Sequence, residues 1–399
     1  MSEPGEILRV AAKGDGVTAD GRYVPFAAPG DVLRADGSLA KGPRHAAPAC
    51  RHFPECGGCQ LQHLDDAALA DFVFDRVIGP VRGQGLEPGR IAPAHLSPPH
   101  SRRRVSLHAQ AIGRRVVLGF REQGSHRIVD MRECPVIAPE LFALVAPIRD
   151  LLERMGNRKL VADIELVLCD QGVAAGIKGL DVEGLAAAEA LIAFAQDHGL
   201  ARLTLDRGYG AETQWEPEPV TVTLGGTPVG LPPEAFLQAT ADGEAALVGA
   251  AREWLEGAGT IADLFAGLGT FAFALAGPAK VLAVEAARDA HLACQAAARA
   301  SDQPVHSLHR DLFRSPLRVE ELDRFDAVLL DPPRAGAREQ VAQIAGSKVP
   351  SVVYISCNPA SWARDAAQLA AGGYRLAEVR PVGQFRWSTH VELASLFVR

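Results

Sequence analysis

The pattern of apolar and polar positions changes character near residue 231. Up to that point, stretches of alternating apolar and polar residues are separated by Gly, Pro and Asp, and helices are expected near residues 140–155 and 182–198. Beyond it, strands alternate strictly with helices, and the strands are continuous apolar runs such as KVLAVE (280–285) and SVVYIS (351–356). Continuous apolar strands between helices predict a doubly wound, Rossmann-like parallel sheet. The predicted fold class is therefore α/β, with an α+β domain ahead of the sheet.

A chain of 399 residues is too long for one compact core, and shifts in composition indicate where it divides. Short strands with Gly and Asp turns come first, a polar linker follows, and a Pro-rich stretch lies between a helical segment and the middle domain. The predicted parts are a short β unit with its linker (1–44), an α+β middle domain (45–62 and 94–230), a helical segment that packs on the C-terminal domain (63–93), and the doubly wound domain (231–399).

Charge is distributed unevenly along the chain. The net charge of −7 argues against a nucleic-acid partner, but residues 100–132 contain eight arginines and two acidic residues, a local charge of +6. Such a run is either a solvated face or a surface that binds RNA phosphates. The N-terminus lacks the pattern of a secretory signal, and the longest uncharged stretch falls short of the roughly 18 apolar residues that span a membrane. We therefore expect a cytoplasmic protein without membrane contact.

The ends of the predicted parallel strands carry the residues of a cofactor site, because ligands bind at that edge of such sheets. The first strand ends in DLFAGLGT, which begins with Asp263, and the second ends in Glu285, which can accept hydrogen bonds from the ribose hydroxyls of a nucleoside. A carboxylate ahead of the glycines suits a cationic, phosphate-free ligand such as S-adenosylmethionine. A nicotinamide dehydrogenase and a ligand-free sheet remain open alternatives on this motif alone.

A cysteine, Cys357, stands where the fifth strand ends, beside the turn that follows the fourth strand. A thiolate that adds to carbon 6 of a pyrimidine makes carbon 5 nucleophilic enough to attack a methyl sulfonium, and a base must then remove the proton on carbon 5. Three carboxylates are candidates for this base: Asp311, Asp331 and Glu392. A terminal strand that returns beside the fifth strand favours Glu392.

Five stretches, SCNPASWARD, DPPRAG, DLFAGLGTF, AFLQ and HVELASLF, together resemble the RNA uridine C5-methyltransferase family. The resemblance extends from Cys50 to the end of the chain. It implies that Cys357 is the nucleophile and Glu392 the proton acceptor. It also implies that S-adenosylmethionine is bound by five residues: Gln238, Phe265, Glu285, Asp331 and Asp311. The position of Asp311 is often Asn in the family.

Three clustered cysteines and a remote fourth form a second motif: Cys50, Cys56, Cys59 and Cys134, the last followed by Pro. Four thiolates can bind zinc or an iron–sulfur cluster, and zinc sites usually show two tight pairs, so the spacing favours iron–sulfur. The family resemblance implies a 4Fe-4S cluster, which the ribosomal RNA branch carries on such a run. The family's N-terminal barrel, the TRAM domain, is expected to be truncated because Cys50 comes early.

The predicted function is transfer of a methyl group from S-adenosylmethionine to carbon 5 of uridine in structured RNA. Ribosomal RNA, in particular 23S rRNA, is favoured because of the cysteine motif, and transfer RNA is the main alternative. Cytosine C5 methylation uses the same chemistry and is a further alternative. A protein of another class, an RNA-binding or iron–sulfur protein without catalysis, would not need Cys357, Glu392 and Asp331 together. We expect a monomer.

Overall fold

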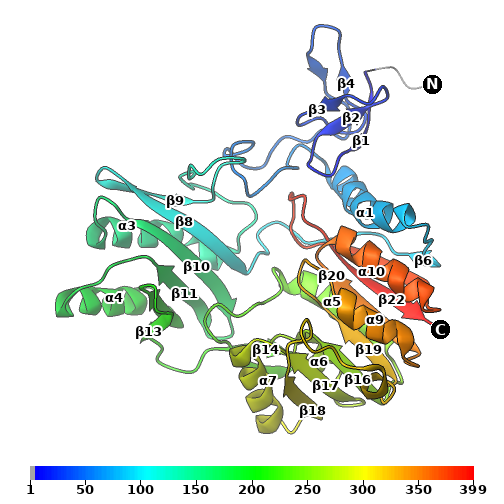
Figure 1. The fold of residues 1–399 in the computed structure, drawn as a ribbon. Helices are drawn as coiled ribbons and strands as arrows, with labels where there is room; N and C mark the ends of the chain where they lie inside the picture. The colour runs from blue at the N-terminus through cyan, green and yellow to red at the C-terminus, as the bar shows by residue number, and fades with distance from the viewer. Residues whose placement is uncertain (1–4) are drawn as a thin grey trace.

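The computed structural model describes residues 5–399, which form three lobes (Figure 1). The N-terminal lobe lies at the top of the view, the middle lobe at the left and the C-terminal lobe at the lower right. The predicted α/β fold class is confirmed by the sheets described below. Within the described residues no helix is long and apolar enough to cross a membrane.

The N-terminal lobe is a small β unit. Two strand groups, a three-stranded antiparallel sheet and a hairpin, are joined by a single bridge between Glu6 and Val32. The five strands are β1 (Ile7–Val10), β2 (Gly16–Thr18), β3 (Tyr23–Val24), β4 (Val32–Leu33) and β5 (Leu39–Ala40). An oligonucleotide-binding barrel also has five strands. This unit therefore has the full number of strands, but each strand is only two to four residues long.

The middle lobe is a six-stranded sheet in the order β13-β12-β11-β10-β8-β9, with one face covered by helices. Only β11 and β12 run parallel. The expected helix at 140–155 is split in two, and the stretch at 126–131 is irregular apart from one bridge at Ile128. The elements are β8 (Arg104–Ile112), β9 (Arg115–Gly119), α2 (Pro139–Phe142), α3 (Val145–Met155), β10 (Val161–Cys169), β11 (Gly172–Lys178), α4 (Leu185–Asp197), β12 (Arg202–Asp206) and β13 (Ala211–Trp215).

The C-terminal lobe is built on a nine-stranded sheet whose first five strands are parallel, in the order β18-β17-β16-β19-β20. The last strand in sequence, β22, then runs antiparallel between β20 and β21. A separate hairpin connects this lobe to the middle lobe. The strands are β14 (Thr221–Leu224), β15 (Thr227–Gly230), β16 (Thr260–Leu264), β17 (Lys280–Glu285), β18 (Val305–His309), β19 (Ala327–Leu330), β20 (Ser351–Ser356), β21 (Arg375–Gly383) and β22 (Glu392–Val398).

Helices cover both faces of this sheet, which explains why its strands are continuously apolar. In β20, Val352 and Tyr354 pack into the core on one face, whereas Val353 and Ile355 pack into the core on the other. The first face is covered mainly by α1 (Asp66–Gly83), α9 (Arg338–Gly346) and α10 (Pro359–Ala371), with the short α8 (Val319–Leu322) beside them. The second face is covered by α5 (Ala241–Trp254), α6 (Thr270–Leu275) and α7 (Arg288–Ala300).

Helix α1 precedes the middle lobe in sequence but packs on the C-terminal lobe, against α10 and β21. The chain then adds two short strands, β6 (Arg90–Ile91) and β7 (His95–Leu96), which both pair in parallel with β21. The Pro-rich stretch that the pattern marks as a boundary therefore forms the edge of the large sheet. The middle lobe is thus inserted between two parts of the chain that lie on one sheet.

Candidate active site

Cys357 occupies a tight connection between the end of β20 and the start of α10. The apolar strand stops at Ser356, and Asn358 caps the helix by accepting a hydrogen bond from the Ala360 amide at 3.2 Å. Pro359 follows at the first helical position, where its missing N–H costs nothing. The side-chain amide of Asn358 also donates to the backbone carbonyl of Arg334 at 2.8 Å, which ties this turn to the loop after β19. The turn leaves the Cys357 thiol half-buried at the catalytic edge of the sheet.

Glu392 lies across from Cys357 although 35 positions separate them in sequence. Strand β22 is antiparallel to β20 and Ser356 pairs with Leu393, so the next position along each strand brings Cys357 opposite Glu392. The Glu392 side chain is only 4% exposed, and its Oε2 has no hydrogen-bond partner within residues 5–399. Burial, reinforced by the charge of Asp331, raises the pKa of Glu392 to about 8.

Asp331 follows β19, the strand beside β20, and burial raises the pKa of its carboxyl to about 7. Two buried glutamines line this part of the site. The Gln238 Nε2 donates to the Asp331 Oδ2 at 3.2 Å, and the Gln384 Nε2 donates to the Gln238 Oε1 at 2.9 Å. Gln384 was not predicted as a site residue, because its only signal is its position directly after β21.

The electrostatics of the site keep the thiol protonated. Burial is the largest cause that raises the pKa of Cys357 to about 11, and the nearby charges of Glu392 and Asp331 add to it. Arg334 acts in the opposite direction. At pH 8 a thiol with this pKa is ionised in roughly one molecule in a thousand. Any reaction through the Cys357 thiolate would therefore need an acceptor for the thiol proton, and Glu392 and Asp331 are the carboxylates beside it.

A second group of predicted site residues lies at the ends of β16 and β17. Phe265 has a left-handed backbone (φ 63°), which turns the chain sharply after β16. The carboxylate of Glu285 accepts hydrogen bonds from the Gly267 amide at 2.8 Å and from the Ala287 amide at 2.6 Å. Each carboxylate oxygen can accept a further bond, so Glu285 can hold the glycine turn and still receive ribose hydroxyls.

Asp311 and Asp263 differ in how they use their carboxylates. Asp311 orders the turn after β18 by accepting from the Phe313 amide at 2.9 Å, and this places the Phe313 ring 5.4 Å from that of Phe265. Asp263 is fully buried, and neither of its oxygens has a hydrogen-bond partner in the described part of the chain. Its pKa is raised well above the usual range by burial and, secondarily, by the charge of Asp331.

The four cysteines of the second motif line one cavity, together with Arg102 and apolar side chains that include Phe120 and Met131. Burial raises the pKa of each thiol, to about 12 for Cys59. Across residues 5–399, no three His, Cys, Asp or Glu side chains are close enough to hold a single metal ion. Four thiols around one cavity are the donor set of a 4Fe-4S cluster, which is larger than one ion and needs more widely spaced ligands.

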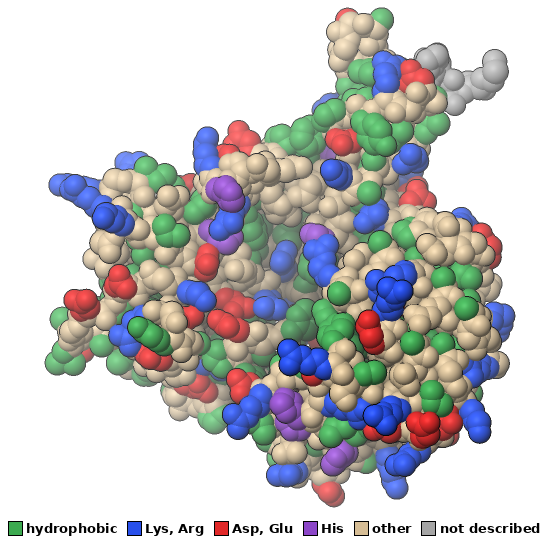
Figure 2. All heavy atoms as spheres, in the orientation of Figure 1, with side chains coloured by type: hydrophobic (Ala, Val, Ile, Leu, Met, Phe, Trp, Pro, Cys, Tyr) green, Lys and Arg blue, Asp and Glu red, His purple; other side chains and the backbone are tan. Residues whose placement is uncertain are grey.

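The arginine run divides into two groups. Arg102, Arg103 and Arg104 are half-buried and bind other parts of the protein. Arg103 forms an ion pair with Glu244 at 2.6 Å and donates to the Gln238 carbonyl at 3.1 Å, while Arg104 pairs with Glu165 at 2.9 Å. The other five arginines of the run are exposed. Figure 2 shows Lys, Arg and His side chains along the hollow between the middle and C-terminal lobes, with acidic side chains among them.

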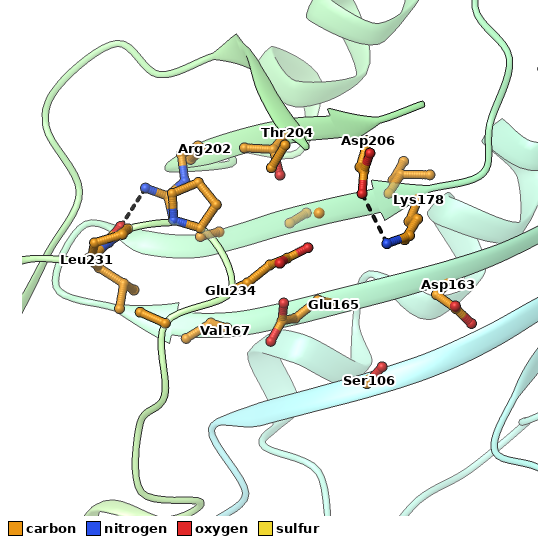
Figure 3. A pocket seen from close by; sticks show the side chains of 18 residues that line it. Ser106, Asp163, Glu165, Val167, Lys178, Arg202, Thr204, Asp206, Leu231 and Glu234 are labelled. Atoms are coloured by element: carbon orange, nitrogen blue, oxygen red, sulfur yellow. Dashed lines mark hydrogen bonds and ion pairs between the residues drawn. The ribbon is translucent and has the colours of Figure 1, made fainter. Parts of the chain in front are cut away.

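A separate hollow of about 210 Å³ lies on the open face of the middle sheet. Its basic side chains are already bound within the protein. Lys178 pairs with Asp206 at 3.1 Å, and Arg202 donates to the Leu231 carbonyl at 2.6 Å (Figure 3). This hollow contains none of the predicted site residues, and its paired charges do not indicate a ligand.

The sequence matches known RNA methyltransferases along nearly its whole length. It is 48% identical to an RNA methyltransferase of Zymomonas mobilis over 99% of both chains. It is 35% identical to the 23S rRNA (uracil(1939)-C(5))-methyltransferase of Edwardsiella ictaluri, over 90% of this chain and 83% of that protein. The profile of tRNA (Uracil-5-)-methyltransferases matches residues 231–399. The chain belongs to the RNA uracil-C5 methyltransferase family.

A solved structure with the same fold also comes from this family. The Pyrococcus abyssi tRNA (uracil-54, C5)-methyltransferase superimposes with a TM-score of 0.76, covers 99% of both chains and is 24% identical. This match confirms the predicted fold, and the sequence relatives confirm the predicted family. In this uracil-C5 methyltransferase, Cys357 and Asp331 follow neighbouring strands and lie at the same edge as Glu392, the first residue of β22. Gln238 contacts Asp331 from the loop ahead of α5. The second group, Phe265, Glu285 and Asp311, lies at the ends of the next strands. The cysteine cavity forms a third group.

Proposed function

We propose that the protein transfers a methyl group from S-adenosylmethionine to carbon 5 of a uridine in RNA, with Cys357 as nucleophile and Glu392 as proton acceptor. The observation that carries this proposal is the convergence of a thiol and two carboxyls of raised pKa, Cys357, Glu392 and Asp331, from three strands onto one point. Perturbed ionisable groups that gather in this way are typical of catalytic sites.

In the proposed reaction Asp331 accepts the proton of the Cys357 thiol as the sulfur adds to carbon 6 of the uracil, and the electron pair of the 5,6 double bond moves onto carbon 5 and its neighbouring carbonyl. Carbon 5 then attacks the methyl carbon of the sulfonium, whose carbon–sulfur bond breaks to leave S-adenosylhomocysteine. Glu392 removes the proton from carbon 5, the bond between carbon 6 and sulfur breaks, and the thiolate departs as the 5,6 double bond is restored. A base with a pKa of about 8 suits this step, because general bases work best when their pKa lies near the operating pH.

S-adenosylmethionine is proposed as the methyl donor because the second group of residues fits a nucleoside. Glu285 is fixed by two backbone amides with lone pairs to spare, and the Phe265 and Phe313 rings offer apolar surface for a base. Asp311 lies in the turn that carries Phe313. A positive sulfonium near Asp331 and Glu392 would favour their ionised forms and so prepare the base for its task.

A 4Fe-4S cluster is proposed for the cavity of Cys50, Cys56, Cys59 and Cys134. A bound cluster would supply a covalent tie between the N-terminal segment and the middle lobe. The test is an analysis of metal and sulfide content. The protein purified without oxygen should be brown and contain iron and acid-labile sulfide. Stoichiometric zinc without sulfide would overturn this assignment.

We propose 23S rRNA as the substrate, since a relative that covers most of the chain is a 23S rRNA methyltransferase. The test is mass spectrometry of nucleosides from separated ribosomal and transfer RNA of a deletion strain. We expect 5-methyluridine to disappear from ribosomal RNA and return when the wild-type gene, but not a Cys357→Ala gene, is restored. If 5-methyluridine disappeared from transfer RNA alone, transfer RNA would become the proposed substrate. Unchanged 5-methyluridine in both would refute the function.

A further inference from the structure

The segment 384–391, here called the strap, connects β21 to Glu392 and crosses the edge of the sheet that carries the site. It is short of regular structure yet well buried: Gln384, Arg386 and Trp387 are all less than one-tenth exposed. Glu392 directly follows this strap and begins β22, where it pairs with Val382 of β21, so a displacement of the strap would reach the Glu392 backbone first.

The strap is held by the segment that carries the clustered cysteines. The Trp387 carbonyl accepts two hydrogen bonds, from the Gln60 amide at 2.8 Å and the Leu61 amide at 2.9 Å. The Thr389 amide donates to the Gln60 side-chain oxygen at 3.4 Å. Gln60 follows Cys59 directly, and its side-chain nitrogen donates to the Gly57 carbonyl at 2.7 Å. Gln60 therefore connects the strap to the segment 50–61, which carries the three clustered cysteines and is here called the cysteine loop.

Trp387 shows that the strap does not adopt its shape on its own. Its backbone φ is 60°, in the left-handed region that a large side chain rarely occupies. Such conformations persist only where the surroundings impose them, and they cluster at functional sites. The two amides of the cysteine loop bind the carbonyl of this residue, and the guanidinium of Arg386, which pairs with Asp66, stacks 4.7 Å from its ring.

We infer that Gln60 is a positioning residue for Glu392, and that the cysteine loop sets the geometry of the proton-abstraction step through the strap. The inference rests on the proposed function of Glu392. It assigns the cysteine-bearing segment a part in the reaction: this segment fixes where the base stands after the methyl group has been transferred. Addition of Cys357 to the uracil does not depend on the strap, because Cys357 is held by β20 and α10.

The test compares adduct formation with adduct release in single-turnover reactions. Gln60→Ala removes two side-chain hydrogen bonds. Gln171→Ala serves as its matched control, because Gln171 of the middle lobe also makes two, both with Thr221 at the start of β14. The substrate is the transcript of whichever RNA lacks 5-methyluridine in the deletion strain. We expect Gln60→Ala to slow release by up to roughly 100-fold, as for a misplaced catalytic group, with formation unchanged.

A structural readout accompanies the kinetics. Hydrogen exchange of the 386–390 amides should become faster in Gln60→Ala and remain as in the wild type in Gln171→Ala. Gln60→Glu keeps an acceptor for the Thr389 amide and should restore most of the release rate. Unchanged release in Gln60→Ala, or equal slowing of formation and release, would overturn the inference. Failure of the proposed function is a distinct result, in which Glu392→Gln itself accumulates no methylated adduct, and the inference then falls with it.

Discussion

Replacing Glu392 with Gln separates the roles proposed for the site. Glutamine keeps the size and hydrogen-bonding reach of the side chain but cannot accept a proton. A carboxylate whose pKa is about 8 instead of 4.5 binds a proton roughly 3000-fold more tightly, a difference of about 5 kcal/mol. The Glu392→Gln variant lacks this proton affinity and therefore cannot remove the proton from carbon 5. Methyl transfer should proceed while release of the thiol stops.

The assay uses S-adenosylmethionine with a radioactive methyl group. Glu392→Gln should accumulate a labelled protein–RNA adduct that resists denaturant and migrates slowly in a gel, and the band should be absent when Cys357 is also replaced. In the wild type the release rate should rise with pH, because a carboxyl with a pKa of about 8 is ionised to about 10% at pH 7 and about 90% at pH 9. Normal turnover by Glu392→Gln, or a release rate that is flat between pH 6 and 9, would refute the assignment.

The same variant should also be more stable than the wild type at alkaline pH. The pKa of Glu392 is about 8 in the folded protein and near 4.5 in the unfolded chain, so the folded state binds this proton more tightly. The contribution of Glu392 to stability therefore falls as the pH rises from about 4.5 to about 8. Urea denaturation should show Glu392→Gln gaining on the wild type across this window, by at most about 5 kcal/mol. A constant difference between pH 4 and 9 would contradict the raised pKa.

Four further substitutions test other parts of the protein. Cys357→Ala should abolish both methyl transfer and the labelled adduct while circular dichroism and thermal unfolding show a folded protein, and residual turnover near wild type would remove Cys357 from the reaction. Glu285→Ala should weaken S-adenosylmethionine by roughly 1.5–3 kcal/mol in calorimetry, as for hydrogen bonds to a charged group, and unchanged affinity would mean that the ribose is held elsewhere. Arg103→Met should lower stability by roughly 3–5 kcal/mol because it leaves Glu244 unpaired at the junction between the lobes. Arg114 is exposed, so Arg114→Ala should not change stability. If Arg114 contacts a phosphate, this substitution should reduce the log–log slope of RNA affinity against salt concentration by about 0.7–0.9. If Arg103→Met changed the salt slope and Arg114→Ala changed stability, the two assignments would be reversed.

The parallel part of the fold was predictable because its signal is local. A strand that is buried on both faces must be apolar throughout, so β16, β17, β19 and β20 can be recognised in the sequence as continuous apolar runs. Their alternation with helices along the chain indicates a parallel sheet. The strand ends, and with them Cys357 and Asp331, follow from the same runs. The return of the terminal strand beside the fifth was also expected from the pattern, and the structure shows that this strand, β22, runs antiparallel to β20.

What the sequence did not reveal depends on contacts between distant segments. Segment 63–93 was expected to pack on the C-terminal domain, but nothing in the sequence indicated that β6 and β7 pair with β21, because the whole middle lobe separates these strands from β21 in the chain. The charge count of the arginine run gave no sign that Arg103 and Arg104 are neutralised by Glu244 and Glu165, which lie 141 and 61 positions away. The N-terminal strands were too short to show a pattern that distinguishes a truncated barrel from a compact one.

The reversed direction of β22 explains how one sheet serves both halves of the proposed reaction. In a purely parallel sheet every strand start lies at the edge opposite the catalytic one, so residues ahead of a strand cannot reach the site. Because β22 is antiparallel, its first residue, Glu392, meets the last residues of β20, and the strap that precedes it also crosses the catalytic edge. The cysteine loop can contact that strap only because α1 carries the preceding chain onto the same lobe. A single strand reversal thus places the base beside the nucleophile and brings the cysteine segment within reach of both.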